Sequence, residues 1–203
     1  MMILVIGNSQ HLSEAICSAY PGHEIKVIPW RSQFHEMEMP PCDLVFIVGF
    51  DYSSYMMRYN DYMNVNVVQP MLAVQRFAKP SADKIYIATQ NGNKNYTFSR
   101  YRYAKEKLGL TLVSQCANSY VIRFDTFATP SQEPLVKGGF FTKLIFSSLA
   151  KFGVVKTVDM QTVSNQLKAY KASCTNDLRD IKGILVTMPR PQFFDRLMRL
   201  FIA

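Results

Sequence analysis

The sequence lacks the features that mark metal-binding, disulfide-stabilised and membrane-spanning chains. Its four cysteines stand apart, with no C-x-x-C pair and no histidine at metal-ligand spacing, which argues against a zinc site and a disulfide framework. No run of about 18 uncharged apolar residues is present to cross a bilayer, and the opening run ILVIG is too short for a signal peptide's apolar region. These absences predict buried thiols, no metal, no transmembrane segment and a cytoplasmic location.

Acidic residues are also few. The chain has 23 Lys and Arg against 15 Asp and Glu, and the resulting formal charge of +8 favours anionic partners such as nucleotides, sugar phosphates, nucleic acid or anionic lipid. Signatures of RNA-binding folds are absent, so we expect no nucleic-acid partner. With 203 residues, 48% of them apolar, and no repeat or Gly/Ser linker, the sequence predicts a single domain over residues 1–203.

What the sequence does contain is an alternation of buried strands and amphipathic helices. The run MILVIG is typical of a parallel strand buried on both faces, and SEAICSAY then shows helical spacing. The same alternation continues along the chain and predicts an α/β fold with a doubly wound, Rossmann-like parallel sheet. The predicted strands are 2–7, 23–30, 43–50, 83–90, 119–127 and 182–188, and the predicted helices are 13–20, 65–78, 101–117 and 160–173.

Two stretches near the end of the chain each allow more than one structural interpretation. Residues 128–153 mix Pro, paired Gly and Phe, and they are either a lid over a pocket at the carboxyl ends of the strands or a plain connecting helix. Residues 190–203 place apolar side chains at helical spacing beside arginines. This pattern predicts a C-terminal helix that contacts the same fold, a second subunit or a membrane surface.

The stretch YTFSRYRYAKEKLG contains two overlapping Tyr-x-x-x-Lys pairs, Tyr101/Lys105 and Tyr103/Lys107. On a helix, the members of each pair lie one turn apart on one face. The two tyrosines are about 200° apart around that helix, so only one pair can face a given pocket. An ordinary basic surface helix with a packed tyrosine is the structural alternative.

Four segments, in order, resemble the short-chain dehydrogenase/reductase family over nearly the whole chain. They are IGNSQHLSEAI at the glycine turn, VNVVQPML at an Asn-bearing helix, IYIATQNG at the Ser/Thr position and YRYAK at the Tyr-x-x-x-Lys motif. The resemblance implies a Rossmann fold, NAD(P)-dependent oxidation or reduction of an alcohol or carbonyl substrate, and a homo-oligomer. A small residue before the lysine and an apolar one three places after it fit the family pattern, so Ala104 and Leu108 favour Tyr101/Lys105.

The resemblance also implies roles for four residues. Tyr101 exchanges a proton with the substrate oxygen, Thr89 positions that oxygen, and Asn66 holds a water that links Lys105 to solvent. A phenol with a pKa of about 10 is a poor base near neutrality. The Lys105 ammonium one helical turn away favours the phenolate, and in the family it also holds the nicotinamide ribose.

The coenzyme side departs further from the family pattern. Of three glycines in the family's first turn only Gly7 is kept, although nearby side chains supply donors for a diphosphate. Arg31 follows the second strand, where an arginine favours the 2'-phosphate of NADP over NAD. The implied coenzyme contacts are Gly7, Asn8, Ser9, His11, Arg31, Gly49 and Lys105.

These losses leave other functions open. One alternative is a redox-inactive Rossmann-like protein that binds a nucleotide, a sugar-nucleotide or a protein partner. A nucleic-acid binder driven by the +8 charge is another, and it predicts steeply salt-dependent association. The segment DYSSYMMRYNDYMN, rich in Tyr and Met, suggests an adaptable pocket wall or interface.

Overall fold

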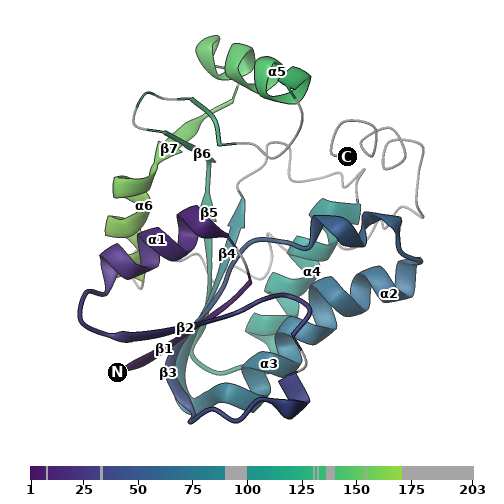
Figure 1. Cartoon of the computed structure of the whole chain (residues 1–203), viewed down its shortest axis with the longest axis vertical. Coiled ribbons are helices and arrows are strands. Elements are labelled where there is room, and N and C mark those ends of the chain that lie inside the picture. The colour runs from purple at the N-terminus through teal and green to yellow at the C-terminus, as the bar shows by residue number, and fades with distance from the viewer. Residues whose placement is uncertain are drawn as a thin grey trace.

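A fully parallel sheet forms the centre of the molecule (Figure 1). Its strands are β1 (Met2–Ile6), β2 (Glu24–Ile28), β3 (Cys42–Ile47), β4 (Ala78–Thr89) and β5 (Ser119–Phe124). They lie in the order β2-β1-β3-β4-β5, and every neighbouring pair is parallel. The residues that the computed structural model describes are 1–7, 9–32, 34–89, 100–129, 131, 133–135, 140–153 and 155–170.

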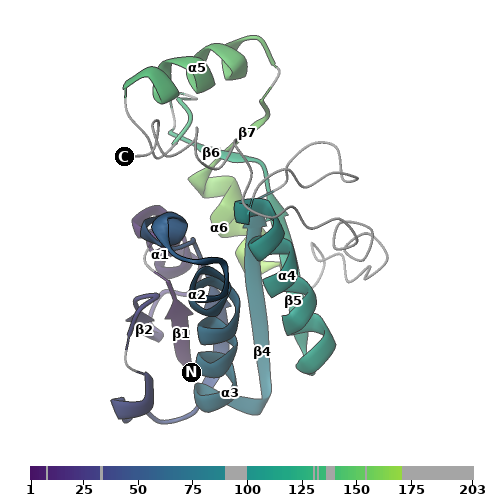
Figure 2. The ribbon, with the colours of Figure 1, turned by 90° about the vertical axis from the view of Figure 1, so that its right-hand side faces the viewer.

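Helices cover both faces of this sheet (Figure 2). On one face lie α1 (Gln10–Ala19) and α6 (Met160–Lys168), and on the other lie α2 (Tyr59–Met63), α3 (Gln69–Phe77) and α4 (Arg100–Gln115). This arrangement confirms the predicted doubly wound, Rossmann-like α/β fold. Short helical turns, η1 (Phe34–Glu36) and η2 (Tyr52–Met56), lie in the connections that flank β3.

The central strands are apolar throughout because both of their faces are covered. In β1, Ile3 and Val5 pack in the core beneath α1 and α6, whereas Leu4 and Ile6 pack in the core beneath α3 and α4. All four side chains have 0% exposure. A strand buried on both faces needs such a continuous apolar run, which is why the sequence identifies this one clearly.

The predicted helix 65–78 is interrupted by a wider π turn, η3 (Asn64–Val68), before α3 begins. Pro70 lies in the first turn of α3. A proline has no N–H to donate to the carbonyl four residues earlier, which here belongs to Asn66, and a π turn accommodates that missing bond. The turn brings the Asn66 side chain into the interior, where it is 1% exposed.

A second, smaller unit follows the fifth strand. It consists of β6 (Thr126–Ala128) paired in parallel with β7 (Thr157–Asp159), with α5 (Phe140–Lys151) between them in sequence. The candidate lid 128–153 therefore holds the end of β6 and all of α5, and its role as a lid stays a prediction. The predicted strand 182–188 and C-terminal helix 190–203 lie outside the described residues. No helix among the described residues is long and apolar enough to cross a membrane.

Two glycines with positive φ differ sharply in the space around them. Gly7, just after β1, has φ +121°, and a Cβ atom there would lie 1.9 Å from the Val48 carbonyl oxygen. Gly22 has φ +77° and nothing within 4 Å of its Cβ position. The first glycine therefore allows a close backbone approach, whereas the second only permits a turn.

This difference makes a matched pair of substitutions informative. We expect Gly7→Ala to lower the free energy of unfolding by about 3 kcal/mol or more, because the methyl group forces β1 and β3 apart. Gly22→Ala should cost about 1–2 kcal/mol, from backbone strain alone. Urea unfolding followed by circular dichroism measures both. Equal losses in the two variants would contradict the close approach.

A second stability prediction concerns alkaline pH. The Tyr20 hydroxyl, at the end of α1, donates a 2.8 Å hydrogen bond to the Leu167 carbonyl of α6. Burial, and secondarily the Asp83 charge, raises the pKa of Tyr20 to about 12. The stabilising contribution of the protonated phenol is complete below the unfolded-state pKa of about 10 and is lost as pH rises through 12. Tyr20→Phe should therefore flatten the fall in unfolding free energy above pH 10, measured by urea titration at stepped pH.

Candidate active site

The candidate active site lies at the carboxyl edge of the sheet, where ligands of such folds bind. Gly7 follows β1, Gly49 follows β3, and Thr89 ends β4. Two backbone hydrogen bonds hold the ends of the strands together: Gly7 N–H donates to the Ile28 carbonyl at 2.7 Å, and Val48 N–H donates to the Ile6 carbonyl at 2.8 Å. The edge is therefore a fixed frame for the side chains around it.

Helix α4 brings Tyr101 and Lys105 together as the spacing predicts. The Lys105 Nζ donates a 3.2 Å hydrogen bond to the Tyr101 hydroxyl, and it lies 5.1 Å from the centre of the ring. Lys105 is 8% exposed, so little solvent screens the pair. Tyr103 instead hydrogen-bonds with Tyr59. The pKa of Tyr59 is raised to about 12, mainly by burial and next by the proximity of Tyr103. The two Tyr-x-x-x-Lys pairs thus have different surroundings, as helical geometry requires.

Aromatic rings from the loop after β3 enclose the Tyr101 ring. Phe50 meets it edge to face with 4.7 Å between centroids, and Tyr52 stacks on it at 5.9 Å. Burial, followed by the proximity of Tyr101 and a hydrogen bond between the two phenols, raises the pKa of Tyr52 far above its ordinary value. Tyr52 therefore stays protonated over the physiological range. Its sequence signal was the Tyr-rich segment 51–64, which predicted an adaptable pocket wall or interface.

Asn66 fixes that same loop from the interior. Its Oδ1 accepts a 3.2 Å hydrogen bond from Asp51 N–H, and its Nδ2 donates to the Ser54 hydroxyl at 2.7 Å and the Tyr62 carbonyl at 2.9 Å. Both amide protons and one oxygen lone pair are thus used within the protein. The expected role of Asn66 in holding a water stays a prediction. The structure adds a loop-anchoring contact that the sequence alone did not indicate.

A cavity of about 350 Å³ lies between the ends of β2 and β3. Arg31 spans one side of it, with its Nε 2.5 Å from an Asp51 carboxylate oxygen and its Nη2 donating to the Ser53 hydroxyl at 2.8 Å. A 2'-phosphate at this position would have to compete with the Asp51 carboxylate for the guanidinium. The cavity is lined by Pro29, Trp30, Arg31, Phe50, Asp51, Tyr52 and Ser53.

Trp30 links this cavity to the two glycines at the carboxyl edge. The indole is 7% exposed, and its Nε1 lies 3.0 Å from the Cβ position of Gly7 and 3.6 Å from that of Gly49. Within the described residues, this buried Nε1 has no hydrogen-bond partner. A buried N–H donor without an acceptor is uncommon and costs free energy unless a ligand or water satisfies it. No motif in the sequence indicates that Trp30 belongs to this site.

An ion pair beneath α4 holds Tyr101 and Lys105 in place. Arg123 of β5 binds Glu106 through two parallel hydrogen bonds of 2.6 Å each, and Glu106 is 6% exposed. Such a bidentate pair fixes the rotation of the helix about its axis. Since Glu106 follows Lys105 directly, the pair sets the direction in which Lys105 points. Sequence reasoning missed it because the partners are on different elements.

The remaining predicted coenzyme contacts are only partly described. Ser9 precedes α1, and its Cβ lies 3.6 Å from the Cβ position of Gly49, so it lines the same edge. His11 lies on the exposed surface of α1, 3.9 Å from the Glu14 carboxylate. Asn8 lies outside the described residues, and so does the side chain of Thr89. Their roles as coenzyme and substrate contacts stay predictions.

The strand order, register and two-sided helix cover define a Rossmann-like α/β protein. No protein-family model and no curated protein matches the sequence. Among solved structures, the chain is similar to a short-chain dehydrogenase/reductase superfamily protein from Agrobacterium tumefaciens with bound NAD. The TM-score is 0.47 at 14% identity, over 83% of this chain and 62% of that one. It is also similar to a short chain dehydrogenase family protein from Francisella tularensis, with a TM-score of 0.49 at 11% identity, over 86% and 91% of the two chains.

Substitutions in the π turn test the anchoring role of Asn66. We expect Asn66→Ala to lower the free energy of unfolding by about 2–3 kcal/mol, because it removes three hydrogen bonds in the interior. Asn64→Ala is the matched control, since Asn64 lies in the same turn but is exposed. Urea unfolding measures both variants. A loss below about 0.5 kcal/mol in Asn66→Ala would contradict the anchoring role.

Proposed function

We propose that the protein is an NAD(P)-dependent oxidoreductase of the short-chain dehydrogenase/reductase type that acts on a carbonyl or alcohol substrate. The observation that carries the proposal is the 3.2 Å hydrogen bond between Lys105 and Tyr101 at the carboxyl edge of the sheet. The family resemblance of the Asn, Thr and Tyr-x-x-x-Lys segments supports the same proposal. An anionic substrate fits the formal charge of +8.

The chemistry assigned to this chain is proton transfer at the Tyr101 oxygen. In carbonyl reduction, the substrate oxygen takes the Tyr101 proton as the carbon gains a hydride, so one O–H and one C–H bond form. The Lys105 ammonium and the Tyr52 phenol lie beside the Tyr101 oxygen and stabilise the oxyanion left on it. Tyr101 then recovers a proton from solvent. Bound NADH or NADPH would supply the hydride.

At the carboxyl edge, the residues around Trp30 and Arg31 fit the nucleotide part of a dinucleotide better than the complete dinucleotide. The Trp30 Nε1, which has no hydrogen-bond partner among the residues that the structure describes, offers a donor beside Gly7 and Gly49. The cavity next to it, about 350 Å³, is at the lower end of the range for small-molecule pockets of roughly 300–1,000 Å³. Because Asp51 already neutralises Arg31, we propose NAD as the preferred coenzyme, with NADP the alternative that the sequence favours.

The aromatic rings packed around Tyr101 favour a second candidate function, nucleotide binding without redox chemistry. Phe50 and Tyr52 contact the Tyr101 ring directly, which restricts the space beside the hydroxyl for both a nicotinamide and a substrate. In this alternative, the cavity of about 350 Å³ at Arg31 would hold a mononucleotide or the nucleotide half of a sugar-nucleotide. The alternative is therefore a redox-inactive nucleotide-binding protein on the same fold.

Titration with dinucleotides distinguishes the two functions. We expect NADH and NAD to change the fluorescence of Trp30, the single tryptophan, at micromolar to millimolar concentrations, and NADPH to bind more weakly. Tyr101→Phe should keep this binding but lower turnover of a panel of aldehydes and ketones by about 10²–10⁴-fold, because the proton donor is lost. Tyr103→Phe is the matched control and should keep turnover.

Two outcomes would count against the oxidoreductase. No binding of either dinucleotide, together with binding of a nucleoside monophosphate or sugar-nucleotide, would favour the redox-inactive alternative. Equal turnover in Tyr101→Phe and wild type would remove Tyr101 from the chemistry. The Asp51→Asn variant checks the coenzyme preference separately, since freeing Arg31 should improve NADPH binding relative to NADH by about tenfold.

A further inference from the structure

Helix α5 lies at one end of the molecule, beyond β6 and β7 and away from the five-stranded sheet (Figures 1 and 2). Large apolar side chains on it face solvent: Leu144 and Ile145 are each 52% exposed, and Phe152, just after the helix, is 81% exposed. Phe152 is eight residues from Leu144 and seven from Ile145, a spacing that places all three on one side of the helix. Single exposed apolar residues are common, but such a group on one helix face marks an interaction surface.

The end of α5 has a defined geometry that keeps Phe152 in place. Gly153 has φ +70° and donates a 2.9 Å hydrogen bond from its N–H to the Ala150 carbonyl. Val155 N–H donates to the Leu149 carbonyl at 3.2 Å. A glycine with positive φ closing the last carbonyls is a common helix C-terminus. The exposure of Phe152 is thus a property of an ordered turn.

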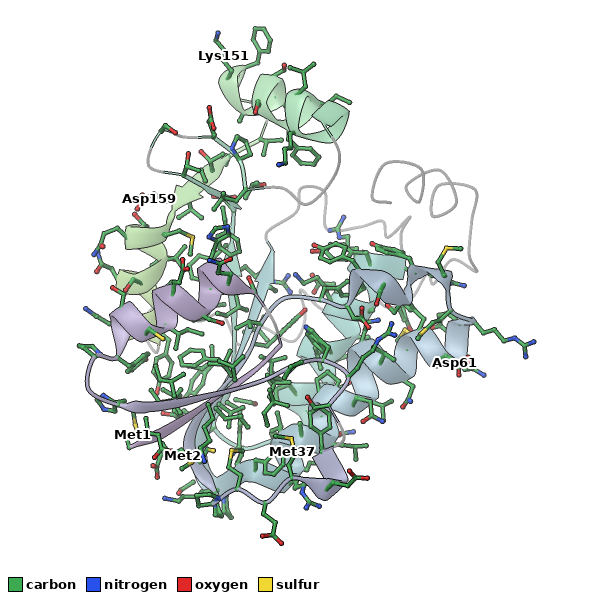
Figure 3. The ribbon with its side chains drawn as sticks, viewed as in Figure 1. Met1, Met2, Met37, Asp61, Lys151 and Asp159 are labelled. Atoms are coloured by element: carbon green, nitrogen blue, oxygen red, sulfur yellow. The ribbon has the colours of Figure 1, made fainter. Side chains whose placement is uncertain are left out.

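The charged side chains described on α5 and directly after it, up to Lys156, are all of one sign. Lys143 and Lys151 are exposed on α5, and Lys156 is exposed just after it. Figure 3 shows Lys151 at the outer end of the helix, directed away from the rest of the chain. The sequence between Glu133 and Asp159 contains no acidic residue, so no carboxylate within that stretch neutralises these lysines. A complementary partner for this surface therefore combines apolar groups with negative charge.

We propose that α5 and Phe152 bind the surface of a membrane that contains anionic phospholipids. Interfacial helices combine apolar side chains, which enter the acyl boundary, with lysines that meet the lipid phosphates. A second copy of the same face would bring lysines together and oppose association. With 12 residues, α5 is about 18 Å long and too short to cross a hydrocarbon core of about 30 Å, so it lies in the interface.

Vesicle co-sedimentation of the full chain tests this proposal. We expect binding to vesicles of phosphatidylcholine with phosphatidylglycerol, little binding to phosphatidylcholine alone, and loss of binding at about 1 M salt, where charges are screened within about 3 Å. The double variant Leu144→Ser/Ile145→Ser should weaken binding by at least about tenfold. Lys143→Gln/Lys151→Gln should weaken it by about 25-fold, since each lysine contributes about fivefold.

Matched controls lie elsewhere on the surface. Leu72→Ser and Lys26→Gln remove an exposed leucine and a half-buried lysine away from α5, and both should bind vesicles as the wild type does. Equal binding to neutral and anionic vesicles, or unchanged binding of the α5 variants, would overturn the proposal. A dimer that the α5 variants dissociate, without vesicle binding by the wild type, would overturn it in favour of a second copy. Dinucleotide titration of the α5 variants separates this surface from the proposed active site, because it should be unchanged.

Discussion

The close approach of the ends of β1 and β3 is the constraint on which the candidate site depends. The Gly7 Cα comes so near the Val48 carbonyl that a Cβ atom there would lie 1.9 Å from the oxygen. This contact brings Gly49 and the Trp30 indole to the same point, so the backbone edge and one buried N–H donor face a common space. A wider separation of Gly7 from Val48 would move Gly49 and Trp30 away from each other and change the geometry of the candidate site.

Two buried polar contacts connect this edge of the sheet to the surroundings of Tyr101 and Lys105. Asn66 ties the loop after β3 to the helix that follows it, and this loop carries the aromatic rings that enclose Tyr101. On the opposite side of the same tyrosine, the Glu106–Arg123 pair fixes α4 to β5. Both contacts sit where a side chain without its partner would be costly, which makes them rigid supports. The Tyr101–Lys105 hydrogen bond is therefore supported by two residues remote from it in sequence, Asn66 and Arg123.

The sequence predicts the sheet well and the site only in part, for a physical reason. Strands such as β1 are recognisable because continuous apolar runs have one structural solution in a parallel sheet. The Tyr101/Lys105 contact is also local, since helical spacing alone brings the two residues together. The Arg31–Asp51 ion pair and the position of Trp30 depend on how two separate loops pack, and no periodicity in the chain encodes that packing. The sequence therefore predicts Arg31 as a phosphate ligand but does not indicate its carboxylate partner, Asp51.

The two ends of the candidate site restrict the proposed dinucleotide in different ways. At the Tyr101 end, the phenol is hydrogen-bonded to Lys105, but Phe50 and Tyr52 contact its ring. At the Arg31 end, space exists, but the cation is already neutralised by Asp51. The loop of Phe50, Asp51 and Tyr52 contributes to both restrictions, so one displacement of that loop would open both ends together. Because Asn66 anchors this same loop, the strength of that anchor determines the free energy needed to displace the loop and make the Tyr101 hydroxyl accessible.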